Sequence, residues 1–310
     1  MSEIRSFPAI RYSSRPSRDI SARLAPPYDV LDEAEKRAFL AQDARNFVAV
    51  DLPHMPPKAA GPAEIYEAAA REMQAWLADG TLVQDKQPAI YVYHQHFEHQ
   101  ARSYTRKMFF ARLRLEPFGQ GSVFPHEQTF GGPKEDRLAL TKATRANMSP
   151  IFGLYPDGDN VVAKRLEAAL APEPLIEGRL QDTYNKVWAV TDSAAIDAVR
   201  ALMADKPIFI ADGHHRYGTA MLYRDWLASQ HGPLSPDHPA NFVLCVCCAM
   251  EDPGLLILPT HRVLAGVDLG PEQLKYDERV EIAHLLAESP EQAVAKLAAF
   301  GPQALALYSA

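Results

Sequence analysis

The residues with the clearest chemical potential lie in one short turn, Asp212-Gly213-His214-His215-Arg216. The apolar run 207–211 before this turn predicts a buried strand, and the run that starts at residue 219 predicts a helix. A tight strand-to-helix turn leaves the first N–H groups of the helix unpaired at the positive end of its dipole. Such a turn is suited to phosphate, so we predict an anion site at Gly213, His214, His215 and Arg216. Asp212 would hold a metal ion or a substrate hydroxyl.

A plainer interpretation of the same turn is also open. In it Asp212 only caps the helix, His214 and His215 are surface residues, and Arg216 pairs with a neighbouring carboxylate. The two interpretations differ in whether the side chains converge on one ligand.

Two further polar clusters could take part in the chemistry. In His126-Glu127 a carboxylate stands beside an imidazole, and such a carboxylate can act as a general base once a partner positions it. Glu127 is therefore the candidate base, although a solvated residue in a capped loop would look the same. His261 and Arg262 follow an apolar run and are either further phosphate donors or residues that face solvent.

Alternation of helical and strand-like patterns along the chain predicts an α/β fold with a mixed or parallel sheet. Expected helices are 32–42, Pro62 to Gly80, 134–146, 160–170, 193–203 and one that opens at Ser289. Expected strands are 46–52, 90–98, 103–115, 150–155, 184–191, 207–211, 241–249, 255–258 and 304–308. The last of these is either an edge strand or a sign that the natural protein continues.

The length of 310 residues favours two lobes. We expect an N-terminal α/β lobe with a β-hairpin over residues 1–120, and a second lobe over 121–310 that carries the anion-binding turn. The three cysteines, Cys245, Cys247 and Cys248, match neither a disulfide framework nor a zinc site. The net charge of −7 has no basic block, and no run is long enough to span a membrane. A cytoplasmic protein without nucleic-acid or membrane partners is expected, and a homo-oligomer is compatible with the sequence.

Several motifs together resemble one uncharacterised family, domain-of-unknown-function family 1015. They are Ala25-Pro-Pro-Tyr-Asp-Val30, Asn46-Phe-Val48, His126-Glu-Gln-Thr129, Asp136-Arg-Leu138, Ala146-Asn147 with Ser149-Pro150, Ile210-Ala-Asp-Gly-His-His-Arg-Tyr217 and Leu258-Pro-Thr-His-Arg262. Members usually extend beyond residue 310, so the resemblance implies that this chain is truncated at its C-terminus. The resemblance implies kinship without a settled activity.

The turn at Asp212 is similar, more distantly, to the phosphate-binding turn of the ParB/sulfiredoxin superfamily. This resemblance implies a ParB/sulfiredoxin-like core around the turn in the lobe 121–310. Sulfiredoxin has a reactive cysteine where this chain has His214, and the DNA-binding module of ParB partition proteins is not found here. The free-serine kinases of that superfamily have a His-Glu pair and an Arg-Leu helix, like His126-Glu127 and Arg137-Leu138. In this chain about 85 residues separate Glu127 from the turn.

These patterns lead to a functional hypothesis. A phosphoryl group would pass from a nucleotide, ATP or ADP with Mg²⁺, to a small hydroxylated metabolite. The catalytic residues would be Glu127, Asp212 and His214. Other residues expected to line the site are Tyr28, Asp29, His126, Lys134, Arg137, Asn147 and Ser149. The alternatives are a non-catalytic, ParB-like nucleotide switch and a hydrolase with zinc or manganese on Asp212, His214 and His215.

Overall fold

The computed structural model describes residues 2–57, 59–127 and 131–258, and further on residues 281, 283, 285–287, 289–300, 304 and 306. Two compact units are present, Met1–Leu256 and Ile257–Ala310. Their boundary differs from the one expected near residue 120, because strands from both sides of that residue join one sheet. The first unit contains every strand named below.

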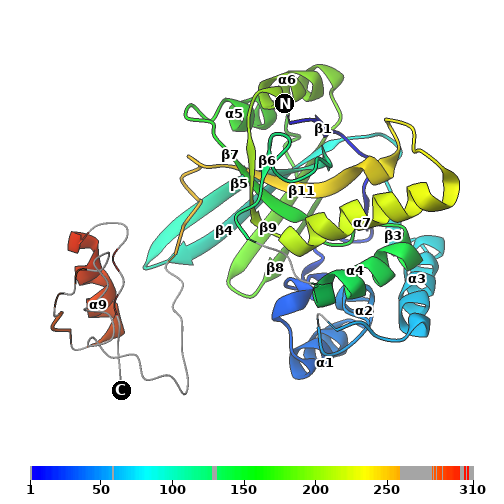
Figure 1. Ribbon diagram of the computed structural model, residues 1–310, viewed down its shortest axis with the longest axis horizontal. Coiled ribbons are helices and arrows are strands. Elements are labelled where there is room, and N and C mark those ends of the chain that lie inside the picture. Colours follow the sequence, from blue (N-terminus) through cyan, green and yellow to red (C-terminus); the bar gives the residue numbers. More distant parts are fainter. Residues whose placement is uncertain are drawn as a thin grey trace. The chain divides into compact units, whose positions relative to one another are not determined.

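The first unit is built on a nine-stranded mixed sheet (Figure 1) with the order β6-β10-β7-β11-β5-β4-β9-β8, in which β1 also pairs with β5. Its strands are β1 Ile4–Arg5, β4 Ile90–His99, β5 Arg102–Arg114, β6 Val123–Phe124, β7 Ile151–Tyr155, β8 Ile176–Leu180, β9 Thr183–Val190, β10 Ile208–Asp212 and β11 Phe242–Ala249. Two neighbouring pairs are parallel, β6 with β10 and β7 with β11, and the others are antiparallel. A small second sheet pairs β2 (Ile10–Tyr12) with β3 (Leu82–Gln84).

Eight α-helices occur among the described residues. They are α1 Glu33–Gln42, α2 Val48–Asp51, α3 Ala63–Ala78, α4 Gly131–Thr144, α5 Val161–Glu167, α6 Ser193–Ala204, α7 His214–His231 and α9 Pro290–Leu297. Local sequence explains several of these helix ends. Asp32 and Glu35 form a capping box at α1, and α3 ends just before Gly80, which has a positive φ of 78°. The searched helices of the described residues include none long and apolar enough to cross a membrane.

The apolar side chains form separate clusters on the two faces of the sheet. One cluster joins strand residues such as Phe109 and Ile210 to α5, α6 and the start of α7. The other contains Met108, Val246 and Cys248. All three cysteines are buried and form no disulfide. They lie on β11, an apolar strand whose side chains are mostly buried. A further core joins α3 and α4 to the small sheet.

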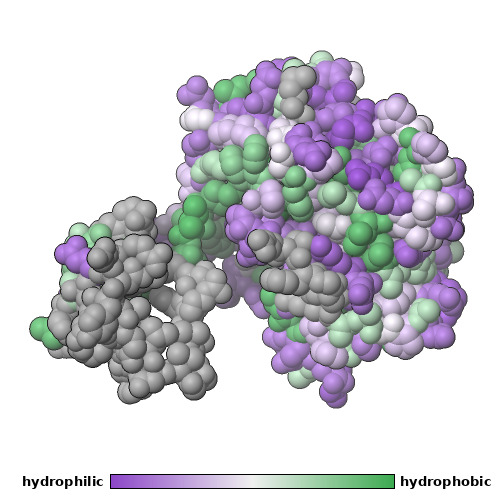
Figure 2. All heavy atoms as spheres, in the orientation of Figure 1, coloured by the Kyte–Doolittle hydropathy of each residue, from purple (hydrophilic) through white to green (hydrophobic). Residues whose placement is uncertain are grey.

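Polar side chains predominate on the face of the first unit that is turned to the viewer in Figure 2. Figure 2 shows mostly hydrophilic side chains over the first unit, with apolar ones scattered among them. This is the ordinary pattern of a hydrated protein surface.

Two of the expected strands are wrong. Residues 46–52 contain the helix α2, because the buried Asn46 side chain accepts a hydrogen bond from the Val48 N–H at 3.0 Å and starts a helical turn. Residues 255–258 form no strand, because the chain turns at Asp252, whose side chain accepts from the Gly254 N–H at 2.8 Å. Of the expected strand 304–308 only residues 304 and 306 are described, and neither of them is part of a strand.

Candidate functional site

Two strand–helix junctions lie side by side in the first unit. Strands β6 and β10 are parallel neighbours, with Val123 beside Ile208, so their carboxyl ends meet at one edge of the sheet. Helix α4 follows β6 and helix α7 follows β10, and ligands of α/β proteins commonly bind at such an edge. The site is therefore made by two junctions. The sequence predicted the second, and of the first it predicted His126-Glu127 and the following helix but not the short strand β6.

Helices α4 and α7 run in the same direction, as Figure 1 also shows. A Cβ atom at Gly218 would lie 3.1 Å from Cε of Lys134. Eight residues further along each helix, Nζ of Lys142 lies 4.6 Å from the ring centre of Trp226. Both N-termini thus point toward the same side, where their dipoles add positive potential. Lys134 contributes a cation between these first turns.

The turn before α7 depends on Gly213, which is the N-cap of the helix. Gly213 has φ of 91°, in the left-handed region that favours glycine. A Cβ atom here would also lie 3.1 Å from Cα of Ile151. The Tyr217 N–H donates to the Gly213 carbonyl at 2.9 Å, so the amides of His214, His215 and Arg216 precede the helical hydrogen-bond ladder.

The structure brings Glu127 to this turn despite the long separation in sequence. Oε2 of Glu127 lies 3.7 Å from Nδ1 of His214, and Oε1 lies 3.9 Å from Nε2 of His126. The two imidazole rings meet edge to face, with centres 4.5 Å apart. A carboxylate is thus placed between two imidazoles. Its side chain is 63% exposed, which leaves it accessible to a substrate.

Hydrogen bonds define the tautomers of both histidines. Nε2 of the buried His214 accepts from the His126 N–H at 3.2 Å, so a neutral His214 carries its proton on Nδ1, toward Glu127. Burial and the neighbouring His126 lower the pKa of His214, despite the opposing effect of Glu127. His126 places Nδ1 2.8 Å from the Ile210 carbonyl, where it can only donate.

Asp212 and Arg216 form an ion pair across the first turn of α7. The Arg216 guanidinium also donates to the Pro150 carbonyl. This pairing was part of the plainer interpretation, but two other parts of that interpretation are wrong. Asp212 makes no side-chain cap bond, and His214 is buried rather than on the surface. Nδ1 of the half-buried His215 is buried without a hydrogen-bond partner among the described residues.

A second charged network lies between α2 and α4. The Arg137 guanidinium donates to the backbone carbonyl of Asp51 at 2.6 Å and to its carboxylate at 3.2 Å. It also pairs with Asp136 and stacks on Tyr28, 3.9 Å from the ring centre. Ser149 donates to the Asp51 carboxylate at 2.7 Å. Burial raises the pKa of Asp51, and Arg137 opposes that rise.

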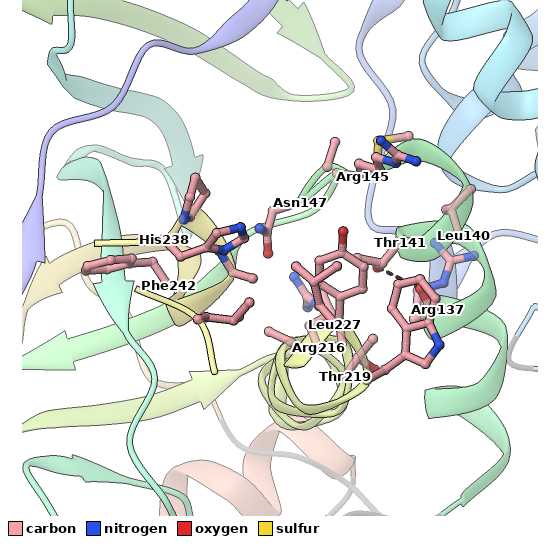
Figure 3. Close-up of a pocket in the computed structure, with 18 of the residues that line it drawn as sticks. Arg137, Leu140, Thr141, Arg145, Asn147, Arg216, Thr219, Leu227, His238 and Phe242 are labelled. Atoms are coloured by element: carbon pink, nitrogen blue, oxygen red, sulfur yellow. Dashed lines mark hydrogen bonds between the residues drawn. The ribbon is translucent and has the colours of Figure 1, made fainter. Parts of the chain in front are cut away.

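This network opens onto a cavity of about 720 Å³, bounded by α4, α7 and residues 231–242 (Figure 3). Four predicted residues line it: Arg137, Asn147, Ser149 and Arg216. In Figure 3 Asn147 points into the cavity from the chain that follows α4, and Arg216 enters from α7. Arg216 therefore connects the cavity with the turn, because the same side chain pairs with Asp212.

The remaining predicted residues are placed as follows. Tyr28 lies against the Arg137 guanidinium, and Asp29 is the next residue of the 3₁₀ turn Tyr28–Val30. His261 and Arg262 lie outside the described residues.

Sequence reasoning missed Asp51, Thr219 and Tyr223 as site residues. Asp51 was hidden in a segment expected to be a strand. The α7 residues repeat at helical spacing, Arg216, Thr219, Tyr223 and Trp226, and this polar and aromatic stripe was the available signal. It shows which face of the helix turns toward the cavity.

The arrangement can bind an anion and move a proton. Among the residues searched in the described chain, no group of three or more His, Cys, Asp or Glu side chains could hold a metal ion. The zinc set expected for a hydrolase, Asp212 with His214 and His215, is therefore not assembled in this structure.

Comparison with known proteins places the chain in a family. The family described as "Protein of unknown function (DUF1015)" matches residues 4–301. No curated protein and no solved structure matches the chain. The match spans nearly the whole sequence and includes both strand–helix junctions. The chain therefore belongs to the DUF1015 family.

Proposed function

We propose that the protein is a phosphotransferase that binds a nucleotide at the N-termini of α4 and α7 and passes a phosphoryl group to a small hydroxylated metabolite. One observation carries the proposal: Glu127 and His126, at the end of β6, meet His214 at the start of α7. The proposed anion site and a positioned carboxylate thereby lie at the same edge of the sheet. Phosphoryl transfer needs both, one to hold the phosphate groups and the other to position the acceptor hydroxyl.

The phosphate groups would be held by the first turn of α7. The amides of His214, His215 and Arg216 point toward the ligand with the helix dipole behind them, and Lys134 adds positive charge from α4. The Asp212 side chain is 60% exposed and uses Oδ2 for Arg216. Its second oxygen would position magnesium or the acceptor. That His261 and Arg262 are further phosphate ligands remains a prediction from the sequence.

Glu127 would act as the general base. Its carboxylate takes the proton of the acceptor hydroxyl, the acceptor oxygen bonds to the terminal phosphorus, and the bond from that phosphorus to the bridging oxygen breaks. ATP thus becomes ADP, and the acceptor becomes a phosphate monoester. Neutral His214 directs its Nδ1 proton at Glu127 and so orients the carboxylate without adding a second positive charge.

The likeness to the ParB/sulfiredoxin superfamily supports the same interpretation. In its serine-kinase branch a His-Glu pair serves a phosphate-binding turn, and here His126-Glu127 lies beside the turn at Gly213. A core of that type within this sheet is part of our proposal.

Binding tests the phosphate site. We expect calorimetry to detect MgATP binding to the wild-type protein and to detect none in Arg216→Ala. The control is Arg224→Ala, which removes another arginine of α7 that pairs with Asp225. Unchanged nucleotide binding in Arg216→Ala would refute the proposed site.

Turnover tests the chemistry. With MgATP and a pool of hydroxylated metabolites, mass spectrometry should detect a phosphorylated product. Glu127→Gln should bind MgATP normally but lose about 10²–10⁴-fold in turnover. Nucleotide binding that changes the oligomeric state, without any product, would favour a ParB-like switch. A stoichiometric transition metal in the purified protein would favour a hydrolase.

A further inference from the structure

We propose that the cavity between α4, α7 and residues 231–242 binds a second ligand, an organic anion with an apolar or aromatic body. Its binding stands apart from the phosphate site. Its role as the acceptor of the phosphoryl group rests on the proposed function.

The size of the cavity indicates an organic ligand. A volume of about 720 Å³ falls within the range of roughly 300–1,000 Å³ that is typical of sites for small organic molecules. An inorganic phosphate or a single metal ion would leave most of this space unfilled. The occupant must therefore carry a body of its own.

The walls of the cavity suit an apolar or aromatic body. Apolar side chains come from three elements: Leu140 of α4, Ala220, Tyr223, Trp226 and Leu227 of α7, and Leu234, Pro239 and Phe242 of the following segment. The rings of Tyr223 and Trp226 lie 5.7 Å apart and tilted at 31°. Lys142 covers one side of Trp226 at 4.6 Å. Such surfaces favour a flat ring or an alkyl chain over a hydrated sugar.

The charges that line the cavity favour an anion. Three arginines reach it, Arg137, Arg145 and Arg216, against one carboxylate, Asp51. Arg137 is paired with Asp51 and Asp136, and Arg216 with Asp212. Arg145 differs, because its guanidinium makes no ion pair or hydrogen bond with any described residue. The exposed Arg145 side chain is therefore the one lining arginine without an ion pair among the described residues, and it is free to pair with an anionic ligand.

Arg145 and Asn147 belong to the segment that follows α4 and supply polar contacts from two places of the lining (Figure 3). Arg145 has φ of 54°, in the left-handed region that residues with a Cβ atom rarely adopt, and its N–H still donates to the Thr141 carbonyl at 2.8 Å. The chain thus turns sharply there and directs Asn147 into the cavity (Figure 3). Each of the two side chains offers N–H donors to an anionic or polar group of the ligand.

The cavity also reaches the proposed phosphate site through Arg216. This side chain lines the cavity and pairs with Asp212 at the turn. A hydroxyl on the ligand near Arg216 would thus stand at the border between the two sites. This is the placement that an acceptor would need.

Three probe molecules separate the contributions that the negative charge and the aromatic ring of a ligand make to its affinity. Indole-3-acetate has both, indole-3-acetamide keeps the ring without the charge, and acetate keeps the charge without the ring. We expect calorimetry on the full chain to show at least tenfold tighter binding of indole-3-acetate than of either other probe. Equal affinity for indole-3-acetate and the amide, or no binding of either, would overturn the proposal.

Variants then locate the binding. Arg145→Gln should reduce the affinity for indole-3-acetate to that for the amide. Arg165→Gln, at an exposed arginine of α5, should change nothing. Ala146→Trp should weaken both indole probes by filling the cavity, with circular dichroism as a check on folding. Full affinity in Arg145→Gln would contradict the proposal. MgATP binding in Arg145→Gln should equal that of the wild type, so loss of the probe and loss of the nucleotide can be told apart.

Discussion

Gly213 is the residue on which the geometry of the proposed phosphate-binding turn depends. Its φ of 91° and its closeness to Ile151 both exclude a side chain. From the sequence, the turn from Asp212 to Arg216 could be predicted because it is continuous. The partnership of Glu127 with His214 could not, because it arises from the parallel pairing of β6 and β10. Asp51 was missed for a similar reason, since its partner Arg137 is distant in sequence.

Replacing Gly213 with alanine should destabilise the protein through both effects. The left-handed backbone costs about 1–2 kcal/mol, and the contact with the Ile151 backbone adds about 1–3 kcal/mol of overpacking. Urea unfolding measures the loss. Gly80→Ala is the matched control, because Gly80 has φ of 78° and open space around it. If both variants lose the same stability, the close approach to Ile151 has no energetic weight.

Asp51 should make the stability depend on pH in an unusual direction. Burial raises its pKa in the folded protein above the ordinary value of 3.8, against the effect of Arg137. The stabilising contribution is therefore complete below that ordinary value and is lost as the pH rises through the folded pKa. Asp51→Asn should gain stability relative to the wild type as the pH rises from 3 to 7. Urea unfolding measures both proteins across this range. If the difference in unfolding free energy between Asp51→Asn and the wild type stayed constant, the raised pKa of Asp51 would be disproved.

At the scale of secondary structure, the site is made by the pairing of α4 and α7. Helical periodicity predicted both helices, and the β-hairpin of β4 and β5 was also expected. Their relative placement was not, because periodicity carries no information about neighbours in space. The failure at residues 46–52 has a different cause: the side chain of Asn46 forms local hydrogen bonds that override the strand preference of valine.

Glu167 of helix α5 forms polar contacts with two strands of the sheet, β4 and β5. This carboxylate lies 2.7 Å from Nε2 of His94 and 2.9 Å from Nζ of Lys107. Burial would raise the pKa of Glu167, but hydrogen bonds from His94 and Lys107 outweigh burial and lower it. The stability that this group contributes is present above the ordinary value of 4.5 and is lost as the pH falls through the folded pKa.

Glu167→Gln should therefore be less stable than the wild type at pH 7, by about 1 kcal/mol or less because the side chain is partly exposed. The difference should shrink as the pH falls below about 4.5. Thermal unfolding at several pH values measures it. A difference that grew on acidification would mean that the carboxylate is not held by these cations.

At the scale of the whole molecule, the chain divides at Leu256 rather than near residue 120. Length suggested two lobes, but strand order is a long-range property. Here the strands after residue 120 lie on both sides of the β4–β5 hairpin. The α/β class and the mixed sheet followed from alternation of elements. The division into units could not be predicted, because it depends on which strands pair with one another in the sheet.

A fragment of residues 1–256 should fold on its own, since it contains the complete nine-stranded sheet and the cores on both faces. We expect one cooperative urea transition with the wild-type far-ultraviolet circular dichroism per residue. A fragment without a cooperative transition would show that Ile257–Ala310 is needed for the fold of the first unit.

The phosphate site can be tested most directly by a crystal structure of the protein with magnesium and a non-hydrolysable ATP analogue. Our proposal predicts phosphate oxygens about 2.7–3.2 Å from the amide nitrogens of His214, His215 or Arg216, with Glu127 facing the terminal phosphorus. A nucleotide bound elsewhere, with this turn in contact only with protein atoms, would contradict it.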